Sequence, residues 1–146
     1  ADPITPFSVL VEHMRAYKES RGKCNKSTSG FEFPMMREAY CAETDEQAWE
    51  EARDAFFYLY QEYLDWGHML DEEGNSVAPG DSRILDLLRQ RFIIGSPETC
   101  VREALRCREE LGVTNLILRM KAPGLANERV LSSIRLWGER VIPALQ

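Results

Sequence analysis

Apolar side chains recur every three to four residues along most of this chain, which is the pattern of helices that bury one face. Four of these stretches begin at residues that are favoured as helix N-caps: Thr5, Thr44, Ser96 and Asn127. Thr44 also forms a capping box with Gln47, and glycines follow the ends of the first three stretches. The expected helices span residues 5–22, 44–67, 84–88, 96–112 and 127–141.

Two stretches between these helices have the composition of buried strands. Residues 31–42 read FEFPMMREAYCA, and the regular strand is expected from Met35 because Pro34 cannot donate a ladder hydrogen bond. Residues 114–120, TNLILRM, form the second strand, and residues 92–95 are a short buried run. The alternation of elements predicts an α/β fold with two parallel strands and about five helices.

Two parallel strands are too few to make a complete sheet. A lone pair leaves the outer edge of each strand with unpaired backbone N–H and C=O groups. We therefore expect further strands to complete the sheet, either from a missing part of the same fold or from another chain.

The composition of the 146 residues is that of a folded globular domain, with 44% hydrophobic and 29% charged residues. The formal net charge of -6 disfavours long-range attraction to nucleic acid or anionic lipid. The sequence has no run of roughly 18 apolar residues, which a membrane-spanning helix requires, and its start lacks the layout of a signal peptide. We expect a cytoplasmic protein that binds neither nucleic acid nor membranes.

The four cysteines give no sign of a metal site. Cys24, Cys41, Cys100 and Cys107 include no CxxC pair, and only two histidines are available to join them. Cys100 and Cys107 lie about 10 Å apart along their predicted helix, which is too far for a disulfide bond. We expect reduced thiols and no bound metal.

Five segments of the chain together carry the pattern of a known family. They are ADPITPF, FPMMREAYCAETDEQAWEEA, FIIGSPETCVREALRCREELG, TNLILRMKAPGL and RVLSSIRLWGERVIPAL. In this order and spacing they resemble the carboxy-terminal portion of the luciferase-like flavin-dependent monooxygenase superfamily. The resemblance implies a (β/α)8 TIM barrel that uses FMN or, alternatively, a deazaflavin.

The resemblance also implies that this chain is incomplete as an enzyme. Residues 1–146 would form a single partial barrel domain, made of the last two strand–helix units and the preceding helix. A complete member has roughly 300 residues or more, and the family's phosphate-binding loops and first-strand catalytic residues have no counterpart here. We expect a fragment of a flavin-dependent monooxygenase or oxidoreductase that is inactive alone. Its expected partners are the amino-terminal barrel portion or identical subunits, and its expected substrate is a small organic molecule.

A second hypothesis rests on the open sheet edges. The chain begins at Ala1 rather than at Met, which fits truncation, cloning or processing of a longer protein. If it is instead a natural small protein, we expect a non-enzymatic binding or assembly module that forms homo-oligomers by pairing its strands with those of other subunits.

Active sites of such barrels lie at the carboxyl ends of the strands. The candidate residues near a substrate or cofactor are therefore Tyr40, Glu43, Arg119, Lys121 and Gly124. Arg119 offers a planar fork of donors that fits an anionic substrate group or flavin oxygens. The alternative for Arg119 is a structural ion pair with Glu38 or Glu43.

Two further features leave alternatives open. Arg37 and Glu38 are adjacent in the first strand, so their side chains point to opposite faces and only one is expected to face the barrel. Residues 67–81 form a loop that is either a lid or a surface excursion, and His68 is the only histidine in it.

Overall fold

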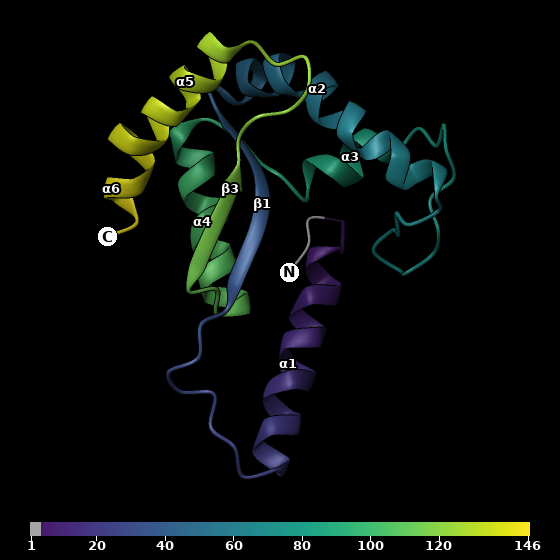
Figure 1. Cartoon of the computed structure of the whole chain (residues 1–146), viewed down its shortest axis with the longest axis vertical. Helices are drawn as coiled ribbons and strands as arrows, with labels where there is room; N and C mark the ends of the chain where they lie inside the picture. The colour runs from purple at the N-terminus through teal and green to yellow at the C-terminus, as the bar shows by residue number, and fades with distance from the viewer. Residues whose placement is uncertain (1–3) are drawn as a thin grey trace.

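The computed structural model describes residues 4–146, folded as helices around a parallel sheet (Figure 1). The helices are α1 (Phe7–Lys23), α2 (Asp45–Asp65), α3 (Ile84–Arg89), α4 (Pro97–Leu111), α5 (Asn127–Leu136), the π-helix η1 (Trp137–Val141) and α6 (Ile142–Ala144). The strands are β1 (Pro34–Cys41), β2 (Ile93–Gly95) and β3 (Asn115–Arg119). The α/β class and the parallel strands are confirmed, and residues 1–3 of the expected domain lie outside the described part.

The sheet has three strands in the order β2-β1-β3, so the expected count of two is corrected. The carboxyl half of β1, from Ala39 to Cys41, pairs with β2, and its amino half pairs with β3. Three residues are too few to show a strand periodicity, and the buried run at residues 92–95 becomes a strand only because β1 supplies its hydrogen bonds. This order places β1 in the centre of the sheet.

Strand β1 is covered by helices on both faces. Tyr40 and Ala42 pack in one apolar cluster with α2, and we call this side the α2 face. Ala39 and Cys41 point the other way, into a cluster with α4 and η1, and we call that side the α4 face. Helix α1 joins α4 on the α4 face through Met35.

The strand order explains why the helices divide between the two faces. Helix α2 leads from β1 to its neighbour β2, and α4 leads from β2 back past β1 to β3. Both connections are crossovers of the same hand between parallel strands, but they run in opposite directions along the sheet. Their helices therefore lie on opposite faces. The core therefore has two parts, one on each side of β1.

The helix boundaries follow the capping signals with two corrections. Thr44 and Ser96 cap α2 and α4 as expected, each accepting a backbone N–H from the residue three positions later. Pro6, not Thr5, is the N-cap of α1, and Ala126 is the N-cap of α5, so that Asn127 is its first residue. Both corrections shift the boundary by one residue and leave the elements unchanged.

The amino ends of α2 and α4 are joined at Asp45. Its carboxylate accepts the backbone N–H of Ser96 at 2.6 Å and the hydroxyl of Thr99 at 3.0 Å. These hydrogen bonds hold the pKa of Asp45 below its ordinary value, chiefly through the Ser96 backbone. The junction lies so close to Gly95 that a Cβ there would come within 2.6 Å of both Asp45 Oδ1 and Thr99 Cγ2.

We predict that Gly95→Ala destabilises the protein by about 1–3 kcal/mol, because the added methyl group must displace a packed carboxylate and a packed side chain. Urea denaturation measures the change. The matched control is Gly22→Ala in α1, where no atom lies within 4 Å of the new Cβ. That variant should gain about 0.5–1 kcal/mol of stability, and an equal loss in both variants would contradict the crowding at Gly95.

Candidate functional site

A charged pair lies on the α2 face near the carboxyl ends of β1 and β3. Glu38 and Arg119 are register partners on these two strands. Arg119 Nε donates to Glu38 Oε1 at 2.6 Å, and Arg119 Nη2 donates to the same oxygen. Of the two alternatives for Arg119, the structure therefore shows an ion pair, and Glu38 is its partner.

The two members of this pair differ in their access to solvent. Glu38 is fully buried, and its Oε2 has no hydrogen-bond partner among residues 4–146. The Arg119 side chain is 36% exposed. Burial lowers the pKa of Arg119, but the neighbouring Glu38 carboxylate outweighs this effect and the net pKa is raised. The guanidinium is therefore a fixed cation at the surface of the sheet.

Tyr60 of α2 completes this polar group. Its hydroxyl lies 3.3 Å from Arg119 Nη2, from which it accepts a hydrogen bond. Burial and the nearby Glu38 carboxylate raise the pKa of Tyr60 above its ordinary value. Residues Glu38, Tyr60 and Arg119 form what we call the carboxyl-end group.

An open apolar strip adjoins the carboxyl-end group on the same face. Met36 and Ile117 are register partners on β1 and β3, two positions before Glu38 and Arg119. Met36 is partly buried and Ile117 is 54% exposed, because α2 covers only the carboxyl half of this face. A partly exposed guanidinium beside exposed apolar surface can contact a flat, polar-edged ligand.

The other candidates at the end of β1 belong to a separate area. Tyr40 is buried and donates its hydroxyl proton to Glu51 at 2.5 Å, and burial and this contact raise its pKa. Glu43 is exposed and accepts a hydrogen bond from Arg140 at 2.9 Å. Both residues line a cavity of about 250 Å³ that Arg119 does not border.

The candidates after β3 serve the following loop. Lys121 donates to the carbonyl oxygen of Leu125 and to the side chain of Asn127, so it closes the turn before α5. Gly124 has a φ of 84° in this turn and borders a shallow cavity beside α2. The five candidates therefore lie near the carboxyl ends of the strands but do not converge on one pocket.

The sequence alone does not identify Tyr60 as a candidate site residue, and it indicates Glu38 only as a possible partner of Arg119. Tyr60 belongs to the aromatic side of α2, and nothing in a single sequence shows which strand residue that side meets. Arg37 and Glu38 do point to opposite faces, yet both are buried, because helices cover both sides of β1. The register between β1 and β3 is the signal that identifies the pair, and it requires the tertiary structure.

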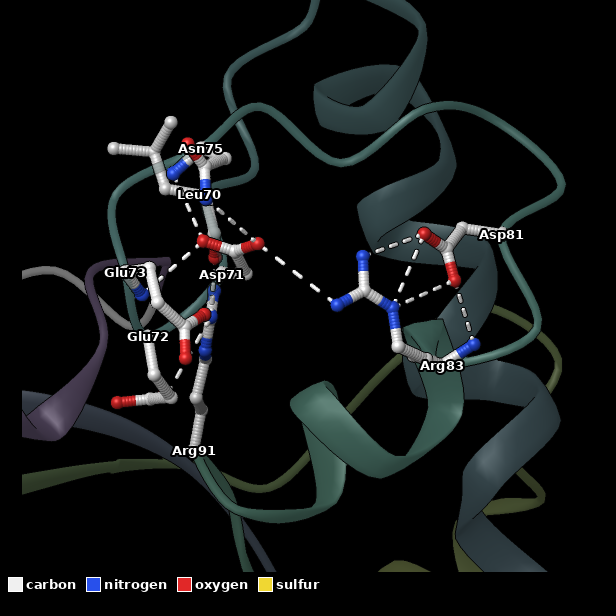
Figure 2. Close-up of polar contacts among 8 residues, drawn as sticks. All are labelled: Leu70, Asp71, Glu72, Glu73, Asn75, Asp81, Arg83 and Arg91. Carbon is white, nitrogen blue, oxygen red and sulfur yellow. Dashed lines mark hydrogen bonds and ion pairs between the residues drawn. The ribbon is translucent and has the colours of Figure 1, made fainter.

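The loop at residues 67–81 is a packed hairpin (Figure 2). Leu70 and Ser76 form an antiparallel bridge, and the flanking residues Met69 and Val77 are buried in the core. Asp71 is buried at the turn, where its Oδ1 accepts the backbone N–H groups of Glu73 at 3.1 Å and Asn75 at 2.8 Å. These contacts support the interpretation of residues 67–81 as a surface excursion rather than as a lid.

Arg91 anchors the hairpin from the interior of the protein. This buried side chain donates to the carbonyl oxygen of Ile4. It also donates to the carbonyl oxygen of Leu70 and lies 3.9 Å from Glu72 (Figure 2). Arg83 contacts Asp81 at 2.9 Å and Asp71 at 3.9 Å on the outer side. His68 is exposed, with its ring edge-on to Trp66, and it takes no part in these contacts.

The described residues 4–146 were also expected to contain reduced thiols, no metal site and no membrane-spanning helix. The four cysteines are free thiols. No group of three or more His, Cys, Asp or Glu side chains in this part of the chain is arranged to hold a metal ion. No described helix combines the length and the apolar character that crossing a membrane demands.

We predict that Arg119→Met destabilises the protein by about 3–5 kcal/mol, because it leaves the Glu38 carboxylate buried without a cation. Chemical denaturation measures the loss. The double variant Glu38→Gln with Arg119→Met should recover much of it, since no buried charge remains. Arg53→Met is the control: it removes an exposed ion pair with Asp54 and should cost less than about 1 kcal/mol. Additive losses in the double variant would contradict the pairing.

We predict that Asp71→Asn reduces the loss of stability in acid. Hydrogen bonds from the Asn75 and Glu73 backbone hold the pKa of Asp71 below its ordinary value of 3.8. The stability that this carboxylate contributes is therefore present above that value and is lost as the pH falls towards the lower folded pKa. Thermal melts between about pH 2 and 7 should show a smaller drop for Asp71→Asn than for the wild type. Asp54→Asn, at a 90% exposed position, should keep the wild-type profile.

Comparisons with known proteins place this geometry in a family. The family model of luciferase-like monooxygenases matches residues 2–115. A comparison with curated protein sequences gives no match. Because the family match covers well over half of the chain, it does not depend on a single motif.

Solved structures match over nearly the whole chain. Monooxygenase RslO1 from Streptomyces bottropensis superimposes with a TM-score of 0.72 at 15% identity, over 99% of this chain and 40% of that one. The second structure is the oxygenating constituent of 3,6-diketocamphane monooxygenase from Pseudomonas putida, a type II Baeyer-Villiger monooxygenase in complex with FMN. It gives a TM-score of 0.67 at 20% identity, over 94% of this chain and 40% of that one. Apo-MsnO8 gives a TM-score of 0.57 at 17% identity, over 91% of this chain and 41% of that one.

At these identities the structural matches show the fold alone, which is that of part of a luciferase-like TIM barrel. The chain spans about 40% of the length of the structures that it matches. Together with the family match over residues 2–115, they establish the assignment: this chain belongs to the luciferase-like monooxygenase family.

Proposed function

We propose that this chain supplies one wall of the flavin- and substrate-binding region of a flavin-dependent monooxygenase. The observation that carries the proposal is the carboxyl-end group of Glu38, Tyr60 and Arg119 beside the open apolar strip of Met36 and Ile117. FMN is the proposed cofactor, with a deazaflavin as the alternative, because one structure with the same fold contains FMN. The proposed substrate is a small organic molecule.

The residues of this face fit a flavin as a single wall. The guanidinium of Arg119 is partly exposed and offers donors to the carbonyl oxygens of a ring edge. Met36 and Ile117 offer apolar surface to the flat of the ring. The carboxyl-end group does not border the five cavities of about 150 to 670 Å³ found among residues 4–146. We therefore propose that other chain segments enclose the ligand.

The roles of the three polar residues follow from their contacts. Glu38 fixes the guanidinium of Arg119 through two hydrogen bonds to one oxygen, so the donors are aligned before a ligand arrives. Tyr60 holds the same guanidinium from the side of α2. The apolar strip excludes water from the ring face, which strengthens the polar contacts at its edge. A bound flavin would supply the redox chemistry.

We propose that the chain does not catalyse turnover alone. It spans about 40% of the matched monooxygenases, and a ligand on its open face remains in contact with solvent. An amino-terminal barrel portion or further subunits would close the site. The free thiols support the proposed cytoplasmic location, where disulfides are rare.

The proposal predicts that FMN binds weakly and at one place on the isolated chain. In NMR spectra of the labelled protein, FMN should shift the amide signals of residues 36–38 and 117–119 in a saturable manner. Arg119→Lys keeps the charge but loses the guanidinium donors that are not directed at Glu38 or Tyr60, and it should weaken this binding several-fold. The rate at which reduced FMN consumes oxygen should be unchanged by the chain.

Two comparisons sharpen this test. Arg135→Lys on α5 changes an exposed arginine outside the carboxyl-end group and should leave FMN binding unaltered. Shifts confined to the groove of about 670 Å³ between α1 and α4, or no shifts at any FMN concentration, would show that the carboxyl-end group does not contact flavin.

A further inference from the structure

Two buried thiols lie next to each other on the α4 face. Cys41 is the last residue of β1, and Cys100 lies near the amino end of α4. Both belong to the same apolar cluster and are fully buried. The Sγ of Cys100 lies 3.9 Å from the carbonyl oxygen of Tyr40, the residue before Cys41, and its thiol is hydrogen-bonded to Cys41. The fold therefore brings together two sulfurs that are far apart in the sequence.

Several elements of this chain hold the two cysteines in position. The backbone N–H of Cys41 donates to the hydroxyl oxygen of Ser133 on α5 at 2.8 Å. The backbone N–H of Cys100 donates to the carbonyl oxygen of Ser96 at 2.9 Å, and its Sγ lies 3.7 Å from the carbonyl oxygen of Gly95. Strand β2 and helix η1 supply further members of the surrounding cluster. The geometry of the pair is therefore set within this chain, whichever segments complete the barrel.

The two thiols differ in how readily they ionise. The hydrogen bond from Cys100 is the largest influence on the pKa of Cys41 and lowers it, while burial acts in the opposite direction. The Arg140 guanidinium lowers this pKa further, and the carboxylates of Glu43 and Glu98, which accept hydrogen bonds from Arg140, raise it. The net pKa of Cys41 is below its ordinary value, whereas the hydrogen bond to Cys41 and burial raise the pKa of Cys100. Cys41 is therefore the member of the pair that forms the nucleophilic thiolate.

A small polar molecule can reach Cys41 through a cavity. Cys41 borders the cavity of about 250 Å³ between the carboxyl end of β1, α2 and α5. The exposed side chains of Glu43 and Glu128 also line this cavity, so it opens to solvent. Within residues 4–146, Cys41 is the one member of the pair that lines it. Since one water molecule occupies about 30 Å³ in the liquid, the cavity has room for hydrogen peroxide, which meets Cys41 before Cys100.

We propose that Cys41 and Cys100 form a redox pair, which hydrogen peroxide converts from two thiols into a disulfide that joins β1 to α4. The Cys41 thiolate gives an electron pair to one peroxide oxygen, and the O–O bond breaks. The leaving hydroxide takes up the proton that Cys41 released and becomes water, and Cys41 becomes a sulfenic acid. The Cys100 sulfur then attacks the Cys41 sulfur, the S–O bond breaks, and hydroxide leaves as water with the Cys100 proton. The two thiols are oxidised to a disulfide, and one peroxide is reduced to two waters.

The pair fits a reversible switch rather than a permanent disulfide. Both thiols are free in the structure, and disulfides in reducing compartments are usually transient and redox-sensing. Thiol reductants return such a disulfide to two thiols. Neither cysteine belongs to the carboxyl-end group, so oxidation of the pair and binding of flavin are separate properties that are tested independently.

Peptide mapping of the complete chain by mass spectrometry tests the proposal. After treatment with hydrogen peroxide, the main disulfide should join the peptides that contain Cys41 and Cys100, and dithiothreitol should reverse it. Cys100→Ala should abolish this link and leave Cys41 as a sulfenic acid that dimedone labels. The matched control is Cys107→Ala, which removes another buried thiol of α4 that packs in a different cluster, and it should form the link as the wild type does.

The same treatment in urea separates the folded geometry from chance pairing. In an unfolded chain the cysteines that are close in sequence meet most readily, so Cys100 should link to Cys107 and Cys24 to Cys41. Circular dichroism confirms that the untreated chain and each variant are folded before peroxide is added. A folded chain that forms no link between Cys41 and Cys100, or one that gives the same pairs with and without urea, would overturn the proposal. Dimedone labelling of Cys107 in place of Cys41 in the Cys100→Ala variant would do so as well.

Discussion

Strand β1 is covered on both faces, and this double burial is the constraint to which the other elements conform. Its residues alternate between the α2 face and the α4 face, so the strand must be apolar or internally paired along most of its length. Met35, Ala39, Tyr40 and Cys41 meet this demand by packing. Glu38 meets it through a cation supplied by the neighbouring strand, which ties the register of β3 to the charge on β1.

The carboxyl-end group illustrates how one interaction serves stability and, in the proposed function, binding. A carboxylate that is removed from water needs a cation, and Arg119 supplies it while keeping part of its own guanidinium at the surface. The same arrangement prepares aligned donors beside the apolar strip. The stability of the sheet and the proposed contact with a polar-edged ligand therefore depend on the same two side chains.

The open half of the α2 face and the open edge of β3 adjoin each other. Helix α2 covers only the carboxyl half of its face, and the sheet ends at β3 with no further strand in residues 4–146. Ile117 lies where these two open regions meet, which explains why an apolar residue in the middle of a strand is more than half exposed. The proposed flavin wall uses the side chain of this residue.

The sequence by itself determined the helices, two of the three strands, the parallel α/β class and the family resemblance. These features depend on local signals: the capping residues Thr44 and Ser96, the terminal Gly112, and apolar periodicities long enough to be distinct. It also placed Arg119 at the carboxyl end of a strand and named Glu38 among its possible partners.

Only the tertiary structure decided the strand order, the existence of β2, the choice of Glu38 over Glu43 and the participation of Tyr60. Each of these depends on which segments, far apart along the chain, lie side by side, and a three-residue strand or a single aromatic on a helix carries no local sign of its neighbour. The burial of both Arg37 and Glu38 has the same explanation. Alternation along a strand shows that two side chains diverge, but the layers above and below decide whether either one reaches water.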